Sequence, residues 1–220
     1  MLLGEVFKNI NKKYKNIYFK NIRFNSKECK PNDIFFAIQG NNSDGNKYIY
    51  DAINNGAKII VSGSKLQRYN KKKVLFIYNK NPRKMLSYIS SQFYKLKPNN
   101  IIAVTGTNGK TSIANFYHQI MSLNNKKVAS IGTLGVLSKK FNLKTNNTTI
   151  DPVNIHKILQ RLKKLGVDNV IIEASSHGLK QHRLDNINFK TAMFTNLSRD
   201  HLDYHKTVKD YLNSKLILFN

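Results

Sequence analysis

Residues 101–111 constrain the fold of this chain more than any other stretch, because an apolar run there breaks into a loop bracketed by glycines. The run predicts a buried strand, and the amphipathic spacing over roughly residues 112–123 predicts a helix. Gly106 and Gly109 let backbone N–H groups approach an anion, and the positive end of the helix dipole points at the same place. This order favours a phosphate-binding loop over a glycine-rich turn with a surface lysine.

Lys110 and Thr111 end this loop, as the corresponding residues end a phosphate-binding loop. The lysine would reach the β- and γ-phosphates of a nucleotide, and the threonine hydroxyl would reach a Mg²⁺ ion. The usual pattern carries a glycine where Val104 stands, so the match is not strict. We still interpret the stretch as a nucleotide site, because strand, loop and helix follow in the order that such a site requires.

The 220 residues, 40% of them hydrophobic, suffice for one large or two small globular domains. The single cysteine, Cys29, permits no intrachain disulfide, and residues 1–5 lack the apolar core of a signal peptide. The sequence contains no apolar run as long as a bilayer-spanning helix. We therefore expect a cytoplasmic protein without membrane insertion.

The net charge of +25 makes nucleic acid or an acidic membrane the first partner to consider. The lysines are nevertheless spread over most of the chain, in short runs such as 71–73 and 126–127, and they accompany many asparagines and isoleucines. This spread indicates a solvated basic surface that also favours anionic substrates. We expect no specific binding of nucleic acid.

Residues 1–97 alternate between strand and helix patterns and end in a polar linker at 95–100. Strands are expected at 34–38, 58–62 and 74–78, and helices are expected near residue 48 and at Pro82. Two polar loops, 25–27 and 41–45, flank the first of these strands. They would bind a polar ligand at one mouth of the sheet, or they are ordinary turns, and the residues alone leave both interpretations open.

Residues 98–220 continue with a strand at 128–132, which completes a parallel strand–helix–strand unit. A helix begins at Asp151-Pro152, with aspartate as its N-cap, and ends at Gly166. The next apolar strand, 169–173, places the lone carboxylate Glu173 at its carboxyl end, where open α/β sheets bind ligands.

A further strand, 191–194, leads into the polar cluster 195–205, so two strands direct functional groups to one rim. The aspartates and histidines of this cluster suggest a zinc site at first sight, namely Asp200, His201, Asp203 and His205. No cysteine accompanies them and a phosphate loop is near, so Mg²⁺ is the favoured metal. We interpret His182 as a surface residue.

The last predicted helix has an apolar stripe that includes one lysine. Val208, Leu212, Lys215 and Phe219 fall at positions i, i+4, i+7 and i+11. Such a lysine usually snorkels to the surface. Because this helix directly follows the polar cluster, we expect Lys215 to face the nucleotide rim instead.

Together these residues resemble the Mur ligases of peptidoglycan synthesis, and among them the tripeptide synthetases, over nearly the whole chain. The motifs at 106–111, 173–183 and 195–205 are similar to the family's nucleotide loop, tripeptide-synthetase signature and metal-rim motif. The first segment resembles the family's uridine-diphosphate-binding domain at residues 24–27, 30–40 and 43–45. Asn25 and Lys27 replace the usual aspartate and arginine there.

The resemblance implies a site for each ligand. The implied ATP contacts are Gly106, Thr107, Asn108, Gly109, Lys110, Thr111 and Ser112. The implied uridine contacts are Phe24, Ser26, Asn41, Asn42 and Ser43, and the implied muramoyl-peptide contacts are Thr148, Thr149, Ser175, Gln181 and Arg183. Mg²⁺ would be held by Thr111, Glu173, His201 and a carbamylated Lys215, with Lys110 and Lys215 as the catalytic residues.

The resemblance also implies an α/β architecture: a small mixed-sheet uridine-diphosphate-substrate domain at 1–97, then a P-loop parallel-sheet central domain at 98–220 that is truncated. We expect the family's C-terminal domain to be absent from this chain or supplied by a separate one. The implied reaction is ATP-dependent addition of an amino acid to UDP-N-acetylmuramoyl-L-alanyl-D-glutamate, and we expect this chain alone to be inactive. The alternatives are a folylpolyglutamate synthetase, a non-catalytic nucleotide-binding remnant, and a basic P-loop ATPase acting on nucleic acid.

Overall fold

The computed structural model describes residues 1–40, 43–64 and 74–220. They form two compact units, Met1–Phe93 and Tyr94–Asn220. The division falls just before the predicted linker rather than after residue 97. Each unit has its own sheet and its own core, so each is described by itself.

The first unit is built on a four-stranded sheet in the order β1-β2-β3-β4. Its strands are β1 (Ile22–Arg23), β2 (Ile34–Ala37), β3 (Ile59–Ser62) and β4 (Leu75–Tyr78). Its helices are α1 (Leu3–Val6), α2 (Ile49–Asn54) and α3 (Pro82–Phe93), with 3₁₀ turns at Lys12–Tyr14, Ser26–Glu28 and Gly45–Tyr48. The three strand pairs that the structure describes in this unit are all parallel. The prediction of a mixed sheet in this unit is therefore wrong.

The continuous apolar runs of β2 and β3 explain the parallel arrangement. All four residues of each strand are buried, which is typical of strands covered on both faces. On one face, Phe35 and Ile60 pack with Ile49 and Ala52 of α2. Gly56 follows α2 with φ +102°, and a Cβ there would lie 2.7 Å from the backbone nitrogen of Pro31. A glycine at the end of this helix is thus required by both conformation and space.

The second unit carries a five-stranded sheet in the order β7-β6-β8-β5-β9. Its strands are β5 (Asn100–Thr105), β6 (Val128–Gly132), β7 (Gly135–Ser138), β8 (Asn169–Glu173) and β9 (Thr191–Phe194). β6 and β7 form an antiparallel hairpin, while the other pairs are parallel. A parallel sheet was expected here, and the antiparallel pair lies in this unit rather than in the first.

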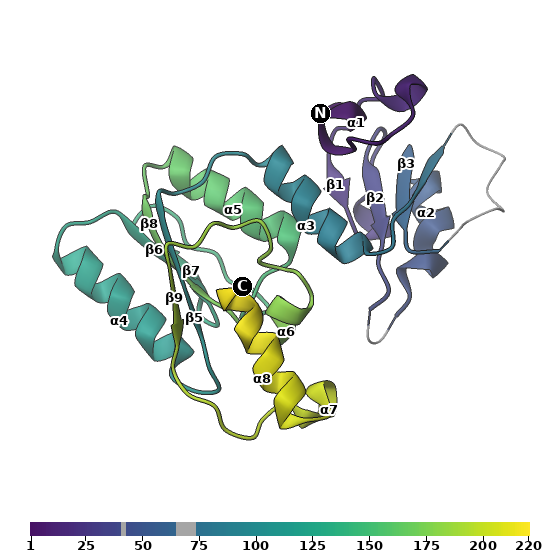
Figure 1. Ribbon diagram of the computed structural model, residues 1–220. Helices are drawn as coiled ribbons and strands as arrows, with labels where there is room; N and C mark the ends of the chain where they lie inside the picture. The colour runs from purple at the N-terminus through teal and green to yellow at the C-terminus, as the bar shows by residue number, and fades with distance from the viewer. Residues whose placement is uncertain (41–42, 65–73) are drawn as a thin grey trace. The chain divides into compact units, whose positions relative to one another are not determined.

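Helices cover both faces of the second sheet (Figure 1). They are α4 (Lys110–Leu123), α5 (Pro152–Lys164), α6 (Ser176–Lys180), α7 (Leu202–His205) and α8 (Val208–Leu216), followed by a 3₁₀ turn at Ile217–Phe219. Alternate residues of β5 serve the two faces: Ile101 and Ala103 pack with the α5 side, and Val104 packs with Ala114 of α4. The predicted cap of α5 is present, because Asp151 accepts a hydrogen bond from the Asn154 backbone N–H.

The parallel strands bring their carboxyl ends to one edge of this sheet. The segments after β5, β6, β8 and β9 therefore meet there, as the sequence predicted for Glu173 and the polar cluster. Across the described ranges, no helix combines the length and apolar character needed to cross a bilayer.

Candidate functional site

The loop between β5 and α4 accepts hydrogen bonds from its own lysine. Lys110 Nζ donates to the carbonyl oxygens of Gly106 and Thr107, both at 2.8 Å. Gly106 and Gly109 have φ of +146° and +85°, so both use backbone conformations that side chains disfavour. The N-cap of α4 is Gly109, which offers no side-chain acceptor. The first N–H groups of α4 are thus left for an anion.

The segment after β9 braces this loop. Thr195 Oγ1 donates to the Asn108 carbonyl oxygen at 2.6 Å, and the Asn108 N–H donates to Asn196 Oδ1 at 3.0 Å. A Cβ on Gly106 would lie 1.8 Å from Thr195 Oγ1, so only glycine fits there. Sequence reasoning assigned this segment to the metal rim, and it missed the support that Thr195 and Asn196 give to the loop.

Glu173 is buried at the carboxyl end of β8, with 2% of its surface exposed. Its Oε2 accepts hydrogen bonds from the hydroxyls of Thr111 at 2.8 Å and Thr133 at 3.1 Å. Its Oε1 accepts one from the Thr133 backbone N–H at 3.0 Å. A Cβ on Gly132 would lie 2.0 Å from Oε1. The end of β6 is therefore shaped around this carboxylate, and Thr133 is a site residue that sequence reasoning missed.

Lys215 of α8 reaches the same loop from the opposite side. It is 1% exposed, and its Nζ donates to the Gly106 carbonyl oxygen at 2.7 Å. Its Nζ also lies 4.3 Å from the centre of the Tyr211 ring. Burial, and then the nearby Lys110 ammonium, lower the pKa of Lys215 to about 8. Burial likewise lowers the pKa of Lys110, against the opposing effect of Glu173.

The inward placement expected for Lys215 is confirmed, but the predicted stripe around it is only partly right. Val208 and Phe219 are 38% and 47% exposed, and the buried face consists of Tyr211, Ser214 and Lys215. The α-helix ends at Leu216, and Phe219 belongs to the 3₁₀ turn that follows. The tighter winding of that turn rotates Phe219 away from the helical stripe.

These groups surround a pocket of about 250 Å³. The residues that line it are Thr107, Asn108, Gly109, Lys110, Thr111, Ser112, Thr133, Thr148, Ser175, Ser176, His201, Tyr211 and Lys215. Most of the predicted nucleotide and metal residues, and two of the predicted peptide contacts, thus share one cavity.

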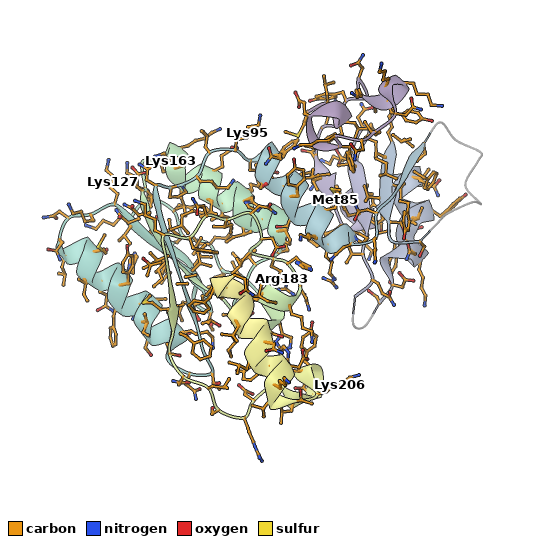
Figure 2. The ribbon with its side chains drawn as sticks, in the orientation of Figure 1. Met85, Lys95, Lys127, Lys163, Arg183 and Lys206 are labelled. Atoms are coloured by element: carbon orange, nitrogen blue, oxygen red, sulfur yellow. The ribbon has the colours of Figure 1, made fainter. Side chains whose placement is uncertain are left out.

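The remaining predicted peptide contacts of this unit form a network beside the pocket. Thr149 is 1% exposed, and its hydroxyl lies 2.9 Å from both the Glu173 carbonyl oxygen and Ser175 Oγ. Arg183, labelled in Figure 2, donates from Nη1 to the Thr149 carbonyl oxygen at 2.6 Å and from Nη2 to Gln181 Oε1 at 2.8 Å. The buried Thr149 therefore fixes the loop before α5, while Thr148 lines the pocket.

The histidines near the pocket differ in environment. His205 is fully buried, and its Nε2 lies 2.9 Å from Ser176 Oγ, which joins α7 to α6. The His201 side chain is 49% exposed and lines the pocket. Within the described ranges, no three His, Cys, Asp or Glu side chains gather closely enough to hold a metal by themselves. His182 is half-buried and pairs with Asp185 at 2.8 Å, so it is less exposed than expected.

In the first unit, predicted uridine contacts follow two neighbouring parallel strands. Phe24, 42% exposed, and Ser26, which is buried, come after β1, and the exposed Ser43 comes after β2. The Ser43 carbonyl oxygen accepts a hydrogen bond from the Gly40 N–H at 2.8 Å. The other two predicted contacts, Asn41 and Asn42, lie outside the described residues.

Signals for the missed residues existed in the sequence. Thr133 follows the end of a buried strand, as Glu173 does, so the rule that selected Glu173 also selects Thr133. Tyr211 stands four residues before Lys215, where two side chains share one helix face. Its hydroxyl donates to Thr107 Oγ1 at 3.2 Å.

Two family models match the chain. The model of the Mur ligase middle domain matches residues 104–220, and that of the Mur ligase family, catalytic domain, matches residues 18–94. These matches agree with the two motif-bearing segments of the sequence.

Two relatives are both named UDP-N-acetylmuramoyl-L-alanyl-D-glutamate–2,6-diaminopimelate ligase. The one from Rhizobium meliloti (strain 1021) is 43% identical over 198 residues, which cover 90% of this chain and 40% of the relative. The one from Rickettsia montanensis is 42% identical over 218 residues, which cover 96% and 44%. The chain thus spans less than half the length of these relatives.

Solved structures also match this chain over less than half of their own length. A structure of a ligase with that name superposes with a TM-score of 0.85 at 30% identity, covering 100% of this chain and 45% of the other. The MurF ligase from Thermotoga maritima in complex with ADP has a TM-score of 0.59 at 19% identity, covering 93% and 44%, and shows the common fold alone.

Proposed function

Because this chain belongs to the Mur ligase family, we propose that it carries the nucleotide and acyl-substrate sites of an ATP-dependent ligase. The ligase adds an amino acid to UDP-N-acetylmuramoyl-L-alanyl-D-glutamate in peptidoglycan synthesis. The observation that carries the proposal is the convergence of Lys110, Glu173 and Lys215 on the loop between β5 and α4. A cytoplasmic location and the lack of a nucleic-acid partner stay predictions.

The loop and α4 hold the phosphates of ATP. Backbone N–H groups at the start of α4 and the ammonium group of Lys110 supply positive charge around the pocket. As the γ-phosphoryl group moves to the substrate carboxylate, Lys110 neutralises the charge that develops on the phosphate oxygens. An acyl phosphate forms, and the incoming amine then displaces phosphate.

The residues present fit a Mg²⁺ ion bound together with nucleotide. Thr111 Oγ1 and Glu173 Oε2 lie 2.8 Å apart beside the pocket, and both are the hard oxygen donors that Mg²⁺ prefers. Mg²⁺ usually takes one or two protein oxygens and completes its shell with phosphate oxygens and water, so a larger protein cluster is not needed. The bound ion would neutralise phosphate charge, and exposed His201 would reach it from the pocket rim.

Lys215 is suited to carbamylation. A pKa of about 8, lowered first by burial, leaves a fraction of the amine neutral near neutral pH. The neutral nitrogen attacks CO₂, a C–N bond forms, and one proton is released to solvent. The resulting carbamate exchanges a buried cation for an anion, which would attract a second Mg²⁺ ion.

The acyl substrate is held by the loop before α5 and by the segment after β8. Thr148 and Ser175 line the pocket, and Arg183 fixes the loop through the Thr149 carbonyl oxygen. The uridine end of the substrate binds in the first unit through Phe24, Ser26 and Ser43, with Asn41 and Asn42 as sequence-based candidates.

Nucleotide titration tests the core of the proposal. Magnesium ADP is expected to bind the wild-type chain, and Lys110→Ala is expected to weaken the affinity at least about tenfold, since a charge-assisted bond contributes roughly 1.5–3 kcal/mol. Lys127→Ala is the matched control, because Lys127 is exposed and precedes the amino end of β6, away from the pocket. Equal affinities for wild type and Lys110→Ala would contradict the proposed site.

A further inference from the structure

Thr133 occupies the turn of the hairpin between β6 and β7. Gly132 and Gly135 pair across that hairpin, so Thr133 and Leu134 form a two-residue turn. Neither residue has a positive φ, and the positive φ of +90° falls on Gly135, so the turn accepts most side chains at both positions. The turn geometry therefore gives no reason for a threonine at this position.

The contacts of Thr133 supply that reason. Its backbone N–H and its hydroxyl donate to the two different oxygens of Glu173, at 3.0 and 3.1 Å. The side chain itself is exposed to the pocket, while the carboxylate that it holds is buried. Because Gly132 has no Cβ, the carboxylate can approach the turn closely enough for both bonds.

The hydroxyl of Thr133 has a second neighbour, Thr148 Oγ1, at 3.0 Å. A carboxylate only accepts hydrogen bonds, so the single hydroxyl proton of Thr133 goes to Glu173. Thr148 must then donate to Thr133. The three side chains form a chain of hydrogen bonds in one direction, from the loop before α5 through the β6–β7 turn to the end of β8.

We propose that Thr133 is a positioning residue that couples the magnesium–nucleotide side of the pocket to the acyl-substrate loop at Thr148. The inference rests on the proposed function of Glu173 as a Mg²⁺ ligand. Thr133 holds both carboxylate oxygens in place before the ion arrives, so the ion need not order them. A ligand that moves Thr148 changes the bond that Thr133 receives, and through it the environment of Glu173.

The experiment measures the affinity for ADP by calorimetry with and without Mg²⁺, and compares the ratio of the two affinities among variants. Thr133→Val keeps the branched shape and removes the hydroxyl, and the ratio is expected to fall about tenfold, the effect of losing one bond to a charged group. Thr133→Ser keeps the hydroxyl and is expected to restore the ratio. Leu134→Ala changes the same turn at a side chain that is 55% exposed, and is expected to leave the ratio unchanged.

The coupling has its own test. Thr148→Val is expected to lower the same ratio, and the double variant with Thr133→Val is expected to lose no more than Thr133→Val alone, because Thr148 acts through Thr133. Losses that add in the double variant would overturn the coupling.

The outcomes separate the inference from the function on which it rests. A wild-type chain that binds ADP equally well with and without Mg²⁺ contradicts the role proposed for Glu173. A wild-type chain with a clear magnesium effect that Thr133→Val retains overturns the inference alone. Loss of the effect in Thr133→Ser overturns it as well, even if Thr133→Val fails to fold.

Discussion

At the scale of single residues, Tyr211 joins two parts of the site that are far apart in sequence. It is 1% exposed; its hydroxyl donates to Thr107 Oγ1 at 3.2 Å, and its ring lies against the Lys215 ammonium. Thr107 Oγ1 also accepts the Ser198 N–H at 3.0 Å. The tyrosine thus fixes α8 to the nucleotide loop through both its hydroxyl and its ring.

The two contacts of Tyr211 can be removed separately. Tyr211→Phe removes only the hydroxyl, and Thr107 keeps its bond to Ser198, so we expect a loss of about 0.5–1.5 kcal/mol in the free energy of unfolding. Tyr211→Leu also removes the ring and leaves a cavity beside Lys215, so we expect about 3 kcal/mol or more. Denaturant titration of both variants measures this difference. Equal losses would mean that the ring contributes nothing beyond the hydroxyl.

At the scale of helices and strands, α5 contains a histidine where its apolar stripe faces the core. His156 is fully buried among residues such as Ile155 and Leu159. Burial, followed by the charge of Lys97, lowers the pKa of His156 to about 3. The folded protein therefore keeps this ring neutral at pH values where the unfolded chain protonates it.

This difference predicts acid sensitivity of the fold. The unfolded chain binds one more proton than the folded protein between about pH 6.5 and pH 3, so stability falls as the pH drops through that window. The contribution of His156 approaches about 1.4 kcal/mol per pH unit well below pH 6.5. His156→Leu should remove this contribution to the pH dependence. The free energies of unfolding of wild type and variant, measured at pH 7.5, 5.5 and 4.5, test this. A variant with the pH profile of the wild type would disprove the assignment.

Some helices and strands could be predicted from the sequence, and others could not. α5 and β8 were found because an N-cap, a 3.6-residue period and a continuous apolar run are local signals. β7 was missed because Gly135–Ser138 is short and the turn before it lacks an asparagine–glycine signal. The antiparallel pair was expected in the first unit and lies in the second, because strand pairing depends on segments that are distant in sequence. The pocket was predicted because the strands that lead into it are parallel, so their carboxyl ends meet at one edge of the sheet.

At the scale of the whole chain, positive charge is distributed over surfaces rather than gathered at the pocket. In the second unit, the labelled Lys127 and Lys163 lie at one end and Lys206 at the other (Figure 2). Of these three lysines, Lys163 has an acidic partner, Asp168, at 2.5 Å. This arrangement agrees with a generally basic surface, for which sequence-selective binding of nucleic acid is not expected.

The two units predict two independent ligand responses. Uridine diphosphate is expected to slow amide hydrogen exchange within Met1–Phe93, and magnesium ADP is expected to slow it within Tyr94–Asn220, because each ligand stabilises only the unit that binds it. Ser26→Ala should weaken the first response and spare the second, and Lys110→Ala should do the reverse. Mass spectrometry of the exchanged peptides measures both. Protection of both units by either ligand would contradict separate sites.

The carbonyl oxygen of Gly106 accepts hydrogen bonds from two lysines, Lys110 at 2.8 Å and Lys215 at 2.7 Å. In the free protein this oxygen takes the place of the phosphate that Lys110 is expected to bind. When nucleotide enters, the Lys110 ammonium exchanges this backbone acceptor for a phosphate oxygen, and carbamylation removes the second ammonium, that of Lys215. The unoccupied loop is therefore held in shape by two cations, of which one later binds the nucleotide and the other is converted into a ligand for a metal ion.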